Sequence, residues 1–195
     1  MNAAKPRTGR IADAFVDVTA MVVTRKRGAR PTVTEQIRPD FVVFYRTAYR
    51  DVSRALSVTL GDADLGREAT DEAMARCYSH WSSVQSYDNP AGWVYRVGLN
   101  WARSLRRRAA RRLLFHGPAS IEMPAVADPE IQRALSELNV ELRAVVVLRF
   151  LLDWSTQETA DALSVRPGTV KSRLHRATSL LQRKLYHLAP EERNA

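Results

Sequence analysis

The residues most suited to direct chemistry lie in a basic stretch near the C-terminus, TQETADALSVRPGTVKSRLHRA, at positions 156–177. It holds two short helical patterns joined by a turn, and Pro167 suits the first turn of the second because its missing N–H has no partner there. On a helical wheel this second pattern gathers Val170, Leu174 and Ala177 on one face and basic residues elsewhere. An α-helix fits the major groove, where arginine pairs bidentately with guanine, so the stretch predicts a DNA-reading helix-turn-helix. For the cations alone, a solvated basic face is the alternative. The residues expected to contact DNA are Thr169, Lys171, Ser172, Arg173 and Arg176.

A second segment, AGWVYRVGLNWARSLRRRAARR at 91–112, combines aromatic and basic residues. One stripe of its wheel is apolar, and a stripe nearly opposite carries Arg96, Arg103 and Arg107. Such a helix packs through one face and offers the other to phosphates, where each neutralised phosphate releases counterions. Asn100 lies between the stripes, and its amide can donate to and accept from a base edge. The interleaved rings suit stacking on unpaired bases, although single tryptophans are more often core residues.

A third group is acidic. Glu68, Asp71 and Glu72 fall on a helical pattern over 64–81 and could meet a basic partner. Taken alone, they could equally be a solvated face supported by Arg76 at i,i+4 spacing.

The composition limits the classes of partner. The 195 residues carry 30 Lys and Arg against 21 Asp and Glu, a net charge of +9, which favours nucleic acid or an acidic membrane surface. The single cysteine suits a reducing cytosol, and the four histidines show no metal-ligand spacing. No phosphate-binding glycine loop or nucleophile elbow is present. We therefore expect no catalytic activity and no cofactor.

The elements that position these groups are helices. From Phe41 onward apolar residues recur at three- and four-residue steps, and no run alternates long enough for a strand. The predicted fold is all-α, with two small helical domains joined by a flexible linker and the helix-turn-helix in the second. The helices are expected near 41–60, 64–81, 90–112, 131–138, 141–152, 156–163 and 167–185, and the segments are a basic extension (1–37, with Met21 as an alternative start), a first domain (38–112), a linker (113–127) and a second domain (128–188). The apolar run 11–23 is interrupted by aspartates and too short to span a bilayer, so no membrane insertion is expected.

Residues 40–188 resemble the extracytoplasmic-function group (group IV) of the bacterial sigma-70 family. GTVKSRLHRA at Gly168–Ala177 is similar to that group's −35 reading helix, and LRFLLDWSTQETADAL precedes it as in the family. GWVYRVGLNWARSLRRR at Gly92–Arg108 resembles its −10 helix, and EATDEAMARCYSHW at Glu68–Trp81 its polymerase-binding helix. Three departures stand out: Ser164 replaces the usual turn glycine, Asp71 replaces a commoner glutamine, and the N-terminal extension is unusual.

The resemblance implies a cytoplasmic transcription initiation factor that binds the β′ and β subunits of core RNA polymerase and promoter DNA, with an anti-sigma factor as a further partner that no residue identifies. Glu68, Asp71 and Glu72 would contact polymerase. Arg96, Asn100, Arg103 and Arg107 would hold and open the −10 element, and the helix-turn-helix would read the −35 element.

Two other classes stay open on the residues alone. A conventional helix-turn-helix regulator would bind duplex DNA without polymerase. A structural nucleic-acid or membrane-surface protein would use net charge without sequence preference, and its binding would depend strongly on salt.

Overall fold

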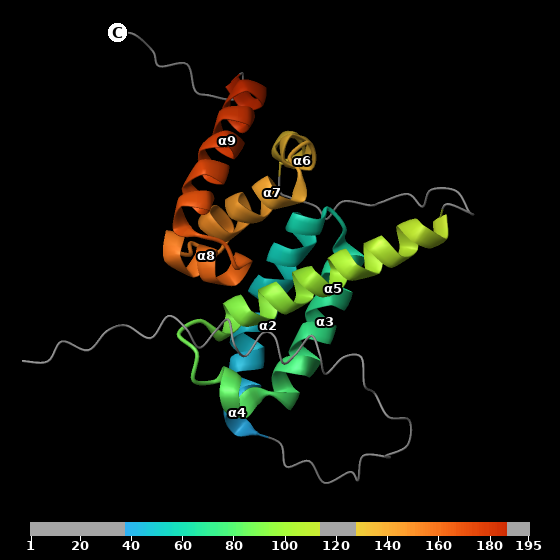
Figure 1. The fold of residues 1–195 in the computed structure, drawn as a ribbon, viewed down its shortest axis with the longest axis vertical. Coiled ribbons are helices and arrows are strands. Elements are labelled where there is room, and N and C mark those ends of the chain that lie inside the picture. Colours follow the sequence, from blue (N-terminus) through green and yellow to red (C-terminus); the bar gives the residue numbers. More distant parts are fainter. Residues whose placement is uncertain (1–37, 114–127, 187–195) are drawn as a thin grey trace, which may run out of the picture. The chain divides into compact units, whose positions relative to one another are not determined.

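The computed structural model describes residues 38–113 and 128–186. The extension 1–37, the linker residues 114–127 and the end of the chain from 187 lie outside the described residues, and so do the predictions made for them. Every regular element in the two described ranges is helical, which confirms the all-α class (Figure 1). The elements are α2 (Pro39–Leu60), α3 (Ala63–Ser79), α4 (Trp81–Val84), α5 (Pro90–Leu113), α6 (Pro129–Ser136), α7 (Val140–Val146), the π-helix η1 (Val147–Leu151), α8 (Thr156–Leu163) and α9 (Pro167–Leu185). Within these ranges, none of the helices is long and apolar enough to span a membrane.

Local sequence sets the helix ends. Gly61 ends α2 in the left-handed conformation at φ 69°, which glycine adopts without a steric penalty. Asp62 then caps α3 by accepting a hydrogen bond from the backbone N–H of Leu65 at 2.9 Å. At α8, Ser155 and Glu158 form a reciprocal capping box, so two backbone N–H groups at that end are satisfied by side chains.

Helices α2, α3 and α5 pack against one another at close range. A Cβ added at Gly98 of α5 would lie 2.7 Å from Leu56 Cδ1 and 2.9 Å from the carbonyl oxygen of Ala69, so only glycine fits this crossing. One turn before it, the fully buried hydroxyl groups of Tyr95 and Thr59 hydrogen-bond at 2.8 Å. Small residues and a satisfied polar pair therefore fix α5 on the first two helices.

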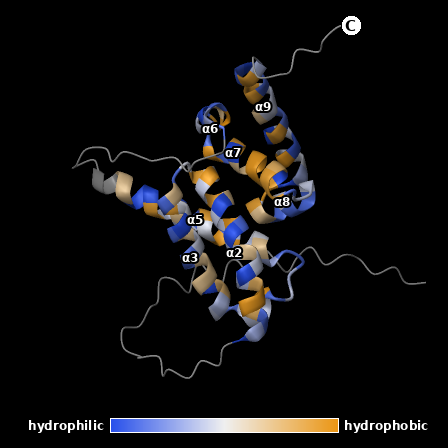
Figure 2. Ribbon diagram, turned by 180° about the vertical axis from the view of Figure 1, so that it is seen from behind, coloured by the Kyte–Doolittle hydropathy of each residue, from blue (hydrophilic) through white to orange (hydrophobic). Residues whose placement is uncertain are grey.

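Helices α7, α8 and α9 form the predicted helix-turn-helix around a small cluster of Val145, Ala160 and Val170, all buried. The short side chain of Ala160 lets α8 pack closely against α7 and α9. Coloured by hydropathy, α9 carries apolar and polar residues side by side along its length (Figure 2). Its apolar side packs on α7 and α8, which leaves its polar side available to a partner.

The N-terminal helices (α2–α5) and the C-terminal helices (α6–α9 with η1) share one hydrophobic core, in which Leu56 and Val94 join Leu148 and Ala177. Helix α8 contacts α5, and η1 contacts α2. Arg143 Nη1 of α7 donates to the carbonyl oxygen of Thr59 at 3.4 Å, at the C-terminal end of α2. The described residues therefore adopt a closed arrangement in which the two groups of helices touch.

Candidate nucleic-acid interface

Helix α9 presents the residues predicted to read DNA. Lys171, Ser172 and Arg176 are exposed, while Thr169 and Arg173 are half-buried at the edge of the same surface. The helix begins at Pro167 without a side-chain cap, and the backbone N–H groups of Thr169 and Val170 donate to the carbonyl oxygen of Arg166 at 2.8 and 3.2 Å. The positive end of the helix dipole and the cations near it together attract an anionic backbone.

The side chains on this surface differ in how firmly they are held. Arg173 is tied to α7, because its guanidinium forms an ion pair with the Glu141 carboxylate. Ser172 donates to the carbonyl oxygen of Thr169 at 3.1 Å within its own helix. No hydrogen bond or ion pair of the Arg176 side chain is recorded within the described residues, so that guanidinium can rearrange toward a base at little cost. Arg176 is therefore the cation best placed for direct readout.

The turn before α9 is unusual at Ser164, the position noted for lacking glycine. Ser164 adopts φ 54° and ψ 45°, the left-handed conformation, and ends α8. The N–H of Val165 donates to the carbonyl oxygen of Ala160 at 3.0 Å, which closes the turn as a Schellman-type cap. Among the described residues other than glycine, only Asp153 shares a positive φ. The turn geometry is thus ordinary, and serine holds it at a conformational cost that glycine would avoid.

Helix α5 carries the residues predicted to contact the −10 element, and these residues differ in how far their side chains are exposed. Asn100 and Arg107 are exposed and Arg103 is half-buried, whereas Arg96 is only 7% exposed. The apolar stripe is buried as expected at Val94 and Val97. The three outer residues therefore form a surface from the middle of α5 toward its C-terminal end, and Arg96 does not join it.

Arg96 is covered by α8. Its Nη1 donates to the hydroxyl oxygen of Ser164 at 2.6 Å and to the carbonyl oxygen of Asp161 at 3.3 Å. Burial lowers the pKa of Arg96, and the charges of Tyr87 and Asp161 act in the opposite direction. An arginine keeps its proton under these conditions, so the buried cation depends on the acceptors of the helix-turn-helix.

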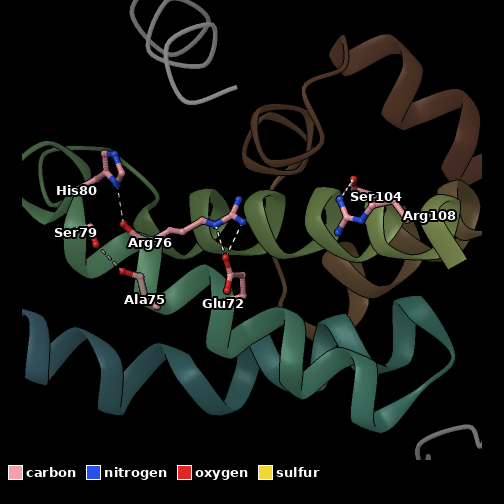
Figure 3. Close-up of polar contacts among 7 residues, drawn as sticks. All are labelled: Glu72, Ala75, Arg76, Ser79, His80, Ser104 and Arg108. Atoms are coloured by element: carbon pink, nitrogen blue, oxygen red, sulfur yellow. Dashed lines mark hydrogen bonds and ion pairs between the residues drawn. The ribbon is translucent and has the colours of Figure 1, made fainter. Parts of the chain in front are cut away.

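Helix α3 presents the acidic group. Glu68 and Asp71 are exposed and Glu72 is half-buried. Glu72 accepts two hydrogen bonds from Arg76, at 2.8 Å from Nε and 2.7 Å from Nη2 (Figure 3). Asp71 accepts from the Tyr49 hydroxyl at 2.8 Å, and burial together with this bond raises the pKa of Tyr49 to about 12. Within the described part of the chain, Glu68 is the one of the three whose carboxylate shows no side-chain hydrogen bond.

Sequence reasoning missed the residues that join the two groups of helices. Arg143 is buried and donates to the carbonyl oxygens of Ser136 and Leu138 as well as that of Thr59. Within the N-terminal helices, Arg106 of α5 likewise donates to the carbonyl oxygen of Leu60 of α2 at 2.9 Å. The only sequence signal for Arg143 is a cation within the apolar run VELRAVVVL, where an exposed position is not expected.

Comparison with known proteins identifies what this arrangement is similar to. The family described as sigma-70, region 4, matches residues 129–181, from the start of α6 into α9. The chain is 31% identical over 145 residues to the ECF RNA polymerase sigma factor SigL of Mycobacterium tuberculosis, covering 69% of this chain and 81% of that protein. It is 29% identical over 152 residues to the RNA polymerase sigma-E factor of Streptomyces coelicolor, covering 75% and 86% of the two chains. The fold matches the sigma factor RpoE of Bartonella quintana, solved in complex with the anti-sigma factor NepR, with a TM-score of 0.69 and 19% identity over 76% of this chain and 98% of that one.

Proposed function

The chain belongs to the ECF sigma factors of the sigma-70 family, and from this premise we propose that it directs core RNA polymerase to promoters through two DNA-reading surfaces and opens the −10 element. Its partners are core RNA polymerase and promoter DNA. The alternative of a conventional regulator that acts without polymerase is not favoured, because the similarity to initiation factors extends through both groups of helices.

The −35 element is assigned to α9. Lys171, Ser172 and Arg176 lie exposed along the helix, and Thr169 and Arg173 flank them. A bidentate arginine–guanine pair is worth about 1–3 kcal/mol of discrimination, whereas a phosphate contact adds affinity at every sequence. Arg176 is the proposed base reader and Lys171 the proposed phosphate contact.

The −10 element is assigned to α5. Arg103 and Arg107 would hold the phosphate backbone, while exposed Asn100 would meet the edge of an unstacked base. Unstacking costs a few kcal/mol for each base step and has to be offset by new contacts to the extruded base. Arg96 is assigned to the same backbone, which requires α8 to leave it.

Core polymerase is assigned to the acidic side of α3. Glu68 and Asp71 are exposed there beside Glu72, and all three suit a basic surface of the β′ subunit. Because Asp71 is already oriented by Tyr49, its carboxylate loses less freedom on binding than an untethered side chain would.

The remaining assignments follow from this role. Residues 38–112 act as the polymerase-binding and −10 domain, 113–127 as the linker, and 128–188 as the −35 domain. The chain acts in the cytoplasm as a subunit of the holoenzyme and has no catalytic residue or cofactor of its own. An anti-sigma factor is a further partner, since the related B. quintana sigma factor was solved with one.

The observation that carries the proposal is the exposed basic surface of α9 on a helix-turn-helix within the matched range 129–181. The experiment is run-off transcription with purified core polymerase on genomic fragments, followed by competition between promoter variants. Arg176→Ala is expected to lower −35 discrimination about tenfold, and Lys171→Ala to weaken binding evenly across sequences. Arg133→Ala, an exposed arginine on α6, is the matched control and should change neither.

Two results would contradict this assignment. Failure of the full chain to support initiation with core polymerase on any fragment would remove the proposed function. Retained −35 preference in Arg176→Ala, with affinity lost equally at all sequences, would make Arg176 a phosphate contact.

A further inference from the structure

The contact between α5 and the helix-turn-helix joins a residue assigned to one promoter element to the turn that supports the reader of the other. Arg96 and Ser164 are 68 positions apart in sequence, yet Arg96 Nη1 lies 2.6 Å from the Ser164 hydroxyl oxygen. A second acceptor, the carbonyl oxygen of Asp161 at the end of α8, lies 3.3 Å from the same nitrogen. The guanidinium is therefore bound by the last turn of α8.

Ser164 is a costly choice at its position in the turn. Its φ of 54° is the conformation that favours glycine, and the turn's own hydrogen bonds are made by backbone groups that glycine would also supply. What serine adds is the hydroxyl group, and that group accepts a hydrogen bond from Arg96. The Ser164 hydroxyl thus serves the contact between α5 and α8, and the turn itself does not need it.

Arg96 can either bind the end of α8 or contact a DNA phosphate, but it cannot do both at once. While its guanidinium is bound under α8, the arginine is 7% exposed and cannot reach a phosphate. On the helical wheel of α5, Arg96 shares one stripe with Arg103 and Arg107, so moving α8 away would expose its guanidinium on that surface. The contact does not stand alone, since the rings of Tyr95 and Trp154 meet edge-on at 6.2 Å beside it.

We propose that Arg96 and Ser164 form an autoinhibitory latch, which holds the free chain closed and hides part of the −10 surface until polymerase or promoter DNA separates α5 from α8. That the latch inhibits promoter binding rests on the proposed function, whereas the closed conformation itself is a property of the isolated chain. A hydrogen bond to a charged group contributes enough to shift the closed-to-open ratio about tenfold or more.

The test removes the hydroxyl in two ways. Ser164→Gly suits the left-handed turn and Ser164→Ala strains it, so the two variants change the stability of the turn in opposite directions while both lose the latch. The matched control is Ser179→Ala on α9, whose hydroxyl donates only to the carbonyl oxygen of His175 in its own helix at 2.8 Å.

The readout is the distance distribution between spin labels in the full chain without polymerase. Labels are attached at Asp51→Cys on α2 and Gln182→Cys on α9, both exposed positions. The native Cys77 does not compete for label, because it is buried and burial raises its thiol pKa to about 12. Both Ser164 variants are expected to raise the ratio of long to short distances about tenfold, and Ser179→Ala to leave it unchanged.

The proposal is overturned if both Ser164 variants keep the parent distribution, or if Ser179→Ala shifts it equally. A turn-only role would give opposite changes in thermal stability for glycine and alanine with unchanged distances, which also overturns it. In run-off assays the Ser164 variants should need less core polymerase for half-maximal transcription. If the parent chain is inactive with polymerase, the proposed function fails, while the distances still decide whether the latch exists.

Discussion

The hydroxyl pair of Tyr95 and Thr59 offers the sharpest test of how α5 is held. Both side chains are fully buried, and their oxygens lie 2.8 Å apart. Tyr95→Phe or Thr59→Val leaves one buried hydroxyl without this partner, which costs about 2 kcal/mol in the free energy of unfolding. The double variant removes both polar groups and should cost no more than about 1 kcal/mol. The two single changes are therefore strongly non-additive.

The assay is urea unfolding of the four chains, supported by thermal melts. A loss of about 2 kcal/mol corresponds to a Tm drop of roughly 4–8 °C for a domain of this size. Burial raises the pKa of Tyr95 above its ordinary value. Its contribution is therefore complete below a pH of about 10 and is lost as the pH rises beyond that, because the unfolded tyrosine ionises first. The Phe variant should lack this alkaline component.

Additive costs in the double variant would refute this reasoning. So would a Tyr95→Phe chain as stable as the parent, since both results mean that apolar packing alone fixes α5 on α2.

Three further outcomes are expected. A chain beginning at Glu35 should support initiation at close to the full rate, since no family motif lies in residues 1–37, and a large loss in a folded truncation would assign a function to the extension. Asn100→Ala should keep thermal stability and closed-complex binding while losing promoter opening, with partial rescue on a template mismatched across the −10 element; parent-rate transcription from an ordinary duplex would return Asn100 to a scaffold role. Gly98→Ala should destabilise the chain by about 1–3 kcal/mol through overpacking, whereas Gly168→Ala, with nothing within 4 Å of its added Cβ, should be neutral or better; equal effects in unfolding experiments would exclude a tight crossing.

Much of the fold was predictable because its signals are local. Pro167 and Gly61 mark helix ends through their own backbone restrictions, and the expected helix 156–163 agrees with α8. Two local details were missed. The helix expected over 64–81 ends at Ser79 and is followed by the short separate helix α4, and the single helix expected over 141–152 is α7 followed by a π-helix.

The site was predictable only in part, because a helical wheel describes the faces of a single helix and not the helices that pack against it. It placed Arg96 on the outer stripe with Arg103 and Arg107, which is correct for α5 in isolation. It had no information about α8, which covers Arg96 through residues more than 60 positions away. The deviation of Ser164 from glycine was visible in the sequence, whereas its partner appears only when distant segments meet.

The long sequence separation of these contacts has a consequence for synthesis of the chain. Helices α2, α3 and α5 pack against one another, whereas the hydrogen bonds that link α2 and α5 to the C-terminal helices join residues 65 to 84 positions apart. Local contacts form first, and domains fold as they leave the ribosome at roughly 5–20 residues per second. The interval between the release of Leu113 and that of Leu185 is then about 4–14 s. During that time the nascent chain exposes the Arg96 side of α5, because the helices that cover it have not yet been made.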